Sequence, residues 1–239
     1  MGSETDAGRS VQTEVPMTSL NKLDRGNLSE QVYTAIRETL MDGRYEPGER
    51  LRINSLAEEL GVSITPVREA IFRLVSEHAL EMKAATAIHV RNLAPDELRE
   101  IQFIRYHLES EAAALAAERI TSKELANLEN LQEAFRVAAG EDPQEASLIN
   151  RQFHFAVVAA AGMPLVFATV ENMWTLMGPL LRTFHITVPV RDLTSGAHKH
   201  YDLLRALGKR DAAGARAAMQ EDIIWGKVLV DWLEKKRAV

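Results

Sequence analysis

The chain of 239 residues has no cysteine, so disulfide bonds, catalytic thiolates and cysteine-bound zinc are all excluded. No apolar run approaches the roughly 20 residues that a membrane-spanning helix needs, and we expect no membrane partner. The N-terminus also lacks a charged start followed by an apolar stretch, which is the pattern of a secretory signal. These absences favour a cytoplasmic protein.

Aromatic residues are scarce as well, at 6% of the chain, whereas hydrophobic residues as a whole make up 46%. This balance is typical of a helical protein rich in alanine and leucine. Acidic residues outnumber basic ones and give a net charge of −6. That charge argues mildly against nucleic-acid binding, because phosphate contacts need lysine and arginine. The objection is limited, since one domain can concentrate basic residues while another carries the acidic excess.

Residues 52–75 have the pattern of two short amphipathic helices that meet at a tight turn. Gly61 stands where the first helix must end in a left-handed residue, which glycine adopts without steric cost. Ser63 or Thr65 can cap the second helix, and Pro66 suits its first turn. The two apolar stripes consist of Leu56, Ala57 and Leu60, and of Val67, Ala70, Ile71, Leu74 and Val75.

The neighbouring segments extend this pair to a winged helix-turn-helix. Apolar residues at helical spacing follow Ser29 and predict a helix that ends at Gly43. Residues 43–51 contain two glycines and a proline and are expected to form a loop. Residues 80–83 and 88–90 alternate well enough to be the two strands of a small β-hairpin wing. In this fold the second helix of the pair enters the major groove of DNA.

The second half of the chain has only helical patterns. Apolar residues recur at helical spacing from Leu98 to Leu115, and no segment has the alternation of a strand. Helix breaks are predicted near residue 121, at 140–143, 162–164, 178–179 and 188–192, and at 208. They give six or seven helices, which we expect to form an all-α bundle with an internal cavity.

The predicted fold is therefore mainly α, with two domains. The predicted divisions are a flexible tail at 1–26, the winged helix-turn-helix at 27–93 and a helical effector-binding and dimerisation domain at 95–237.

Several segments resemble known families in order and spacing. EPGERL at 46–51, LAEELGVS at 56–63 and PVREAIFRL at 66–74 resemble the DNA-binding domain of the GntR family of bacterial repressors. Segments at 105–117, 150–162 and 200–219 resemble the FCD effector domain of the FadR branch. The resemblance implies a transcriptional regulator that senses a small organic acid. GntR members usually have arginine at Ile64 and glycine at His78 and Ala87. The loss of the arginine at position 64 implies an altered operator.

The start of the recognition helix offers hydroxyl and guanidinium groups to DNA. The alternative for Arg68 is a surface salt bridge to Glu59 or Glu69, and Ile64 either packs on a thymine methyl group or faces solvent. Since one helix contacts only a few base pairs, we expect a homodimer on a palindromic double-stranded operator. The predicted DNA-binding residues are Arg50, Arg52, Asn54, Ser63, Thr65, Arg68 and Lys83.

The FCD resemblance also implies a divalent metal ion, either zinc, nickel or manganese. Family members bind it with aspartate and histidine at the positions of Asn150 and His154, and with histidines at those of His200 and Asp222. Here two imidazoles remain instead of three, so affinity for zinc or nickel should fall. The alternative is that these histidines are ordinary core or surface residues. His198 is expected to lie outside the site.

A guanidinium can hold a carboxylate with two parallel hydrogen bonds. The FCD resemblance places Arg105 toward the cavity, where it would bind a small carboxylate effector; its alternative partner is Glu109, four residues on. Arg182 is a second candidate for ligand binding. We therefore predict a DNA-binding regulator controlled by an organic acid. The alternatives are a metal-dependent enzyme that uses the same ligands, and a DNA-binding protein without a ligand.

Overall fold

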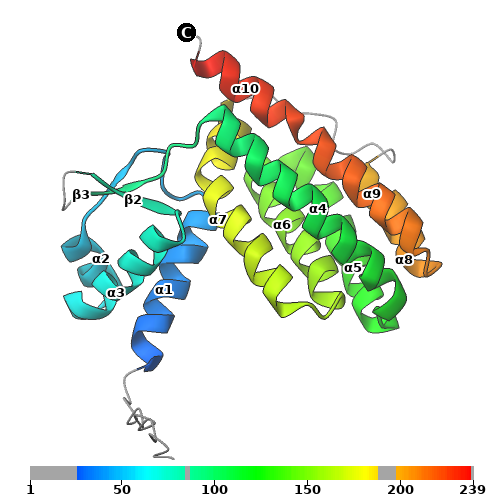
Figure 1. Cartoon of the computed structure of the whole chain (residues 1–239), viewed down its shortest axis with the longest axis horizontal. Coiled ribbons are helices and arrows are strands. Elements are labelled where there is room, and N and C mark those ends of the chain that lie inside the picture. Colours follow the sequence, from blue (N-terminus) through cyan, green and yellow to red (C-terminus); the bar gives the residue numbers. More distant parts are fainter. Residues whose placement is uncertain (1–25, 84–86, 188–197, 238–239) are drawn as a thin grey trace, which may run out of the picture.

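The computed structural model describes residues 26–83, 87–187 and 198–237 and confirms a mainly α fold. The N-terminal part contains a helix, a helix-turn-helix and a small sheet, and the C-terminal part is a bundle of helices (Figure 1). Apart from Gly26, the predicted tail lies outside the described residues. The N-terminal helices are α1 (Gly26–Met41), α2 (Ile53–Leu60) and α3 (Ile64–Ser76).

The wing is a three-stranded antiparallel sheet in the order β1-β3-β2. The predicted hairpin is confirmed: Leu80 lies opposite Val90, and both are buried. The prediction of a loop up to residue 51 is wrong at its end, because Leu51 pairs with Ile88 on the other edge of β3. Backbone groups of β3 thereby gain partners on both sides. The strands are β1 (Arg50–Leu51), β2 (Leu80–Lys83) and β3 (Ala87–Val90).

The turn between α2 and α3 has the predicted left-handed glycine. Gly61 has φ 66°, and its N–H points at the carbonyl oxygens of Ala57 and Glu58. Ser63 precedes α3 in extended conformation, but its side chain makes no capping hydrogen bond, and Thr65 lies inside the helix. The capping prediction is therefore not confirmed, and the hydroxyl groups of both residues face outward.

His78 occupies the position where GntR proteins usually have glycine. Its φ is 63°, in the left-handed region that disfavours a residue with a β-carbon. Two backbone hydrogen bonds close this turn, from the N–H of His78 to the carbonyl of Val75 and from the N–H of Ala79 to that of Leu74. His78 therefore adopts a conformation that costs strain in a residue with a β-carbon.

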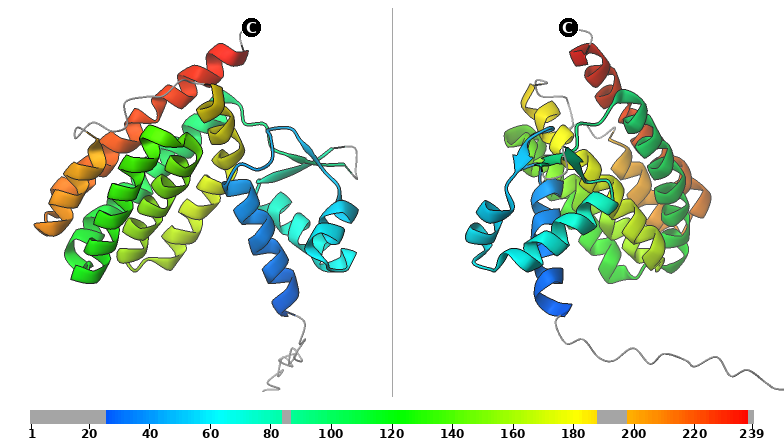
Figure 2. Two further views of the ribbon diagram at one scale, coloured as in Figure 1. Left: turned by 180° about the vertical axis from the view of Figure 1, so that it is seen from behind. Right: turned by 60° about the vertical axis from the view of Figure 1, so that its left-hand side comes forward.

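The C-terminal bundle contains seven helices in the described part of the chain. Helix α7 lies between α1 and the rest of the bundle, and α4 packs against α6, α7 and α9 (Figures 1 and 2). No helix that the structure describes is long and apolar enough to cross a membrane. The helices are α4 (Pro95–Arg119), α5 (Ser122–Glu141), α6 (Pro143–Ala160), α7 (Pro164–Thr187), α8 (Lys199–Gly208), α9 (Ala212–Trp225) and α10 (Lys227–Arg237).

The helix break predicted at 178–179 is wrong. Helix α7 continues through Pro179, although proline removes one backbone donor and crowds the preceding turn at a cost of about 3 kcal/mol. Every residue from Met173 to Leu180 is buried, and this packing outweighs the local cost. Instead, a break that the sequence analysis did not predict falls at Gly226, which separates α9 from α10.

Helices α1 and α7 are joined closely at Gly178, where a β-carbon would lie 2.3 Å from the carbonyl oxygen of Leu40. Arg37 of α1 donates to Thr175 Oγ1 at 3.1 Å and to Glu171 Oε2 at 3.2 Å. Arg182 donates to the carbonyl of Gly43 at 3.1 Å. The N-terminal part is therefore anchored on α7 by backbone contact and by arginine side chains.

Candidate metal centre and DNA-binding surface

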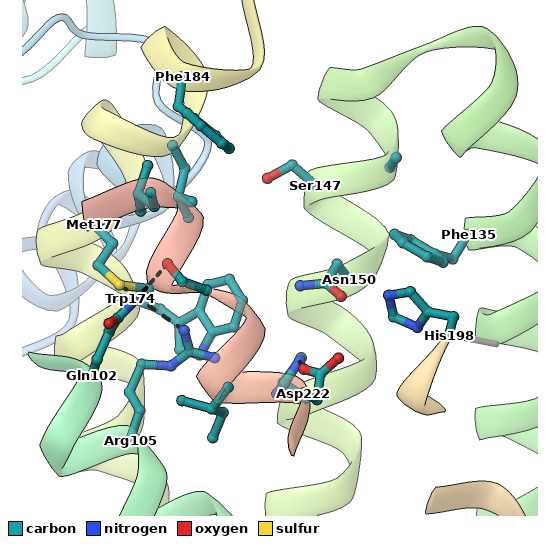
Figure 3. Close-up of a pocket in the computed structure, with 16 residues that line it drawn as sticks. Gln102, Arg105, Phe135, Ser147, Asn150, Trp174, Met177, Phe184, His198 and Asp222 are labelled. Carbon is teal, nitrogen blue, oxygen red and sulfur yellow. Dashed lines mark hydrogen bonds and ion pairs between the residues drawn. The ribbon is translucent and has the colours of Figure 1, made fainter. Parts of the chain in front are cut away.

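The helical bundle contains a cavity of about 120 Å³, lined mainly by α4, α6, α7 and α9. Figure 3 shows polar side chains around it, among them Arg105 of α4, Asn150 of α6, Asp222 of α9 and His198 just before α8. Trp174, Met177 and Phe184 supply an apolar wall. A small site with apolar walls and a few converging polar groups is typical of a ligand pocket.

Three metal-ligating groups meet at one side of this cavity. His154 lies on α6, His200 on α8 and Asp222 on α9, and their ligand atoms all lie within 4.8 Å of one another. Asp222 Oδ2 is 3.1 Å from His154 Nε2, and Asp222 Oδ1 is 3.8 Å from His200 Nε2. The predicted grouping of these three residues is thus present in the fold, although they are far apart in the sequence.

The outer nitrogen of each imidazole has its own buried partner. Nδ1 of His154 lies 2.7 Å from Glu109 Oε2, and Nδ1 of His200 lies 2.7 Å from Gln132 Oε1. Both Nε2 atoms therefore turn toward Asp222. Nε2 of His200 is buried and has no hydrogen-bond partner. Carboxylate or amide groups behind metal-binding histidines fix the ring and its tautomer in the same way.

The charges of the cluster follow from burial and neighbouring groups. Burial would lower the pKa of His154, but the carboxylates of Glu109 and Asp222 outweigh it and raise this pKa to about 9. Burial lowers the pKa of His200 well below its usual value, so this imidazole is neutral. Burial would raise the pKa of Asp222, but the hydrogen bond with His154 and the nearby imidazoles lower it, and the carboxylate stays ionised.

These features fit a divalent cation. Two donors bound to one zinc-like ion at about 2.1 Å lie roughly 3–3.5 Å apart, close to the observed 3.1 Å and 3.8 Å. His200, neutral and with an unpaired buried Nε2, and the ionised Asp222 are both in the form that binds metal, whereas His154 must release the Nε2 proton that it shares with Asp222. Asn150 lines the cavity beside Asp222, as Figure 3 shows, and can add an amide oxygen.

Glu109 links the cluster to the arginine beside it. Its buried carboxylate accepts from Arg105 Nε at 2.5 Å, from Trp174 Nε1 at 3.3 Å and contacts His154. Arg105 therefore pairs with Glu109, the alternative partner considered in the sequence analysis, and it also lines the cavity. Nη1 of Arg105 lies 4.0 Å from Met177 Sδ, a weak acceptor, and remains available to a ligand.

Four residues depart from the sequence analysis. His198 lines the cavity, contrary to prediction, and its ring centroid lies 4.3 Å from that of His200. Gln132 and Trp174 contact the site but were not predicted, because they come from other helices and carry no local signal. Arg182 does not line this cavity; its guanidinium holds the carbonyl groups of Gly43 and Arg44 between the two parts of the chain.

All seven predicted DNA-binding residues are exposed. Arg50, Arg52 and Arg68 have no hydrogen-bond or ion-pair partner within the described ranges, so the alternative salt bridge of Arg68 is absent there. Lys83 Nζ lies 2.7 Å from Glu81, an exposed pair that is easily exchanged for a phosphate. The arrangement leaves basic groups available at the N-terminus of α2, on α3 and on the wing.

Comparisons with known proteins agree with this geometry. The pattern of the bacterial regulatory proteins of the gntR family matches residues 28–90, and that of the FCD domain matches residues 97–224. The HTH-type transcriptional regulator McbR of Escherichia coli is 36% identical over 206 residues, which cover 86% of this chain and 93% of McbR. The Exu regulon transcriptional regulator of Escherichia coli is 28% identical over 220 residues, covering 85% and 84%.

One solved structure supports the same family, and a second one shares the fold. Escherichia coli McbR/YncC superposes with a TM-score of 0.80 at 35% identity, over 86% of this chain and 98% of that one. A GntR regulator from Rhodococcus, at 18% identity and a TM-score of 0.68, shares the fold over 84% and 96%. These relatives are transcriptional regulators, which decides against the enzyme hypothesis. The chain is a DNA-binding transcriptional regulator that belongs to the gntR family and carries an FCD domain.

Proposed function

We propose that this regulator binds its operator through α3 and the wing, and that a divalent metal and a small carboxylate in the FCD domain control this binding. The observation that carries the proposal is the convergence of His154, His200 and Asp222 beside Arg105, whose Nη1 has only the weak acceptor Met177 Sδ. Domain limits of 27–93 and 95–237 remain our inference. Binding to chromosomal DNA would place the protein in the cytoplasm.

The operator contact is centred on Arg68. Its guanidinium is exposed, has no partner among the described residues and lies in the second turn of α3. We expect Arg68→Ala to weaken specific operator binding by about 1–3 kcal/mol, because an arginine that contacts a base edge contributes this much. Gel-shift titration of a selected duplex measures it. Arg136→Ala, an exposed arginine of the FCD domain, is the control; equal affinities of the two variants would remove Arg68 from the interface.

The metal would be held by His154, His200 and Asp222, with Asn150 as a further ligand. When bound, the ion supplies a positive charge and open coordination positions for an exogenous oxygen atom. We expect the double variant His154→Ala, His200→Ala to lose metal retention after loading with zinc, nickel or manganese. Elemental analysis after desalting measures the content. His107→Ala, an exposed histidine on α4, is the control; equal metal content in double variant and wild type would contradict the site.

The carboxylate would bind between the metal and Arg105. Glu109 already holds Nε and Nη2 of Arg105, at 2.5 Å and 3.4 Å, which leaves Nη1 toward the cavity. The ring of Trp174 lies 4.2 Å from the guanidinium carbon and fixes its plane. The cavity, of about 120 Å³, is small and suits a ligand of few carbon atoms. These features support a small organic acid over a larger metabolite.

Helix α7 is our proposed route from the cavity to the DNA-binding domain. Trp174 lines the cavity, and the next residue, Thr175, accepts a hydrogen bond from Arg37 of α1. On α6, Arg151 follows Asn150 and forms a 2.8 Å salt bridge with Asp42 just beyond α1. A ligand that moves either helix therefore changes a direct contact with the DNA-binding domain. It alters operator affinity if it prefers one arrangement of the two domains.

We also propose a homodimer, since a palindromic operator needs two recognition helices. The outer sides of the neighbouring helices α4, α9 and α10 expose Phe103 at 65%, Ile224 at 57% and Val228 at 38%. Large apolar side chains exposed on adjacent helices are typical of a surface that a second protein copy covers. This face supports dimerisation through the FCD domain.

A further inference from the structure

The recognition helix has two large apolar side chains on its outer face. Ile64 is 42% exposed and Phe72 is 50% exposed, whereas Val67, Ile71 and Leu74 are fully buried. Four residues turn a helix by about 40° beyond a full circle, so positions 64, 68 and 72 follow one another along one side. Thr65 and Arg68 therefore share a single arc of the surface with both apolar residues.

The other sides of α3 already have partners in the structure. Glu69 accepts a hydrogen bond from Ser29 of α1, and Arg73 forms a 2.6 Å salt bridge with Glu30. Arg73 also lies 3.6 Å above the ring of Tyr33. The inner side is packed against the core. The arc with Ile64, Arg68 and Phe72 is thus the one face of this helix that lacks a partner among the described residues.

Apolar side chains on this face require an apolar group on DNA. In the major groove the bases present hydrogen-bond donors and acceptors, and the 5-methyl group of thymine is the apolar exception. We propose that Ile64 and Phe72 bind thymine methyl groups in each operator half-site, on either side of the base pair that Arg68 contacts. This inference rests on the proposed operator contact of α3.

The spacing of the two residues limits how far apart the thymines can lie. Eight residues of helix extend about 12 Å, which corresponds to at most three or four base-pair steps of 3.4 Å. Ile64 stands in the first turn of α3, the part that approaches base edges in helix-turn-helix proteins, and Phe72 stands two turns further on. The half-site is therefore expected to have thymines separated by a few base pairs, with the Arg68 contact between them.

Replacement of thymine by deoxyuridine tests the proposal, because it removes the methyl group and keeps every hydrogen-bonding group. A duplex is first selected from a random library with the full-length chain, and each thymine of its half-site is then exchanged in turn. We expect two exchanges to weaken binding about fourfold each, the value for one buried methyl group. The loss of affinity at the thymine that Ile64 contacts should vanish in Ile64→Ala, and the loss at the thymine that Phe72 contacts should vanish in Phe72→Ala.

Leu165→Ala is the control, since Leu165 is an apolar residue 84% exposed on α7 of the FCD domain. It should keep both deoxyuridine penalties. Penalties that are absent in wild type, or that persist in the two α3 variants, would overturn the proposal while Arg68-dependent binding stands. A change in sedimentation without a change in DNA affinity would assign the face to a second copy and would also overturn it. Failure to select any duplex would overturn the proposed function itself.

Discussion

Replacing Gly178 with alanine is expected to destabilise the protein and to loosen α1 from α7, although alanine is normally the better helix former. A β-carbon at this position would lie 2.3 Å from the carbonyl oxygen of Leu40 and 2.7 Å from Cα of Met41. Both atoms belong to the backbone of α1, so no side chain can rotate away. Helix α1 must shift, and overpacking of this kind costs about 1–3 kcal/mol or more.

Urea unfolding of the full-length chain measures this effect. Gly208→Ala is a matched control, because a β-carbon there would meet only the side chain of Leu125 at the ordinary distance of 3.7 Å. We expect the control to keep its stability or to gain up to about 1 kcal/mol from helix propensity. Equal stability of the two variants would contradict the close contact between the domains and the coupling route built on it.

Replacing Glu109 with alanine is expected to cause the largest loss of stability of any substitution proposed for the cavity. The carboxylate is fully buried and partners Arg105, His154 and the indole N–H of Trp174. Burial would raise its pKa, but Arg105 and His154 lower this pKa to about 2, so the group is ionised. Removing one member of a buried ion pair costs about 3–5 kcal/mol, because the remaining charge has no partner.

Glu111→Ala, two residues along the same helix, provides the comparison. Its carboxylate pairs with Arg216 at 2.7 Å and 2.8 Å but is exposed, and water and salt screen such surface pairs so that they contribute little to stability. In urea unfolding, Glu109→Ala should lose much more free energy of unfolding than Glu111→Ala. Metal retention should fall in Glu109→Ala as well, because His154 loses the group that orients its ring, and should be unchanged in Glu111→Ala. Similar losses in both variants would contradict the role of Glu109.

Features of the fold that depend on residues close together in the sequence could be predicted from the sequence. The turn at Gly61 and the hairpin followed from glycine conformation and from alternation. By contrast, Pro179 predicted a helix break that the buried packing of α7 overrides. The break at Gly226 and the two-residue strand at Arg50–Leu51 were missed, because each depends on packing or pairing rather than on a local pattern.

Only some residues of the cavity could be predicted, because the others are brought there by packing between helices and have no local sequence pattern. His154, His200 and Asp222 followed from a family resemblance, whereas Gln132 and His198 became visible only once α5 and α8 were packed together. The sequence does contain one signal of a buried ion pair beside the site. Arg105 and Glu109 lie at the four-residue spacing that continues the buried stripe of α4. Two opposite charges on an apolar helix face indicate a buried pair beside a functional site.

We expect a carboxylate bound in the FCD domain to change the affinity of α3 for DNA. Calorimetric titration of the metal-loaded protein with a panel of small organic acids, with and without a saturating selected duplex, tests it directly. We expect one acid to bind with an affinity that differs about 5- to 150-fold between the two conditions, the range of a typical coupling of about 1–3 kcal/mol. An acid that binds equally well in both conditions would show that the cavity is not coupled to DNA and would contradict the account.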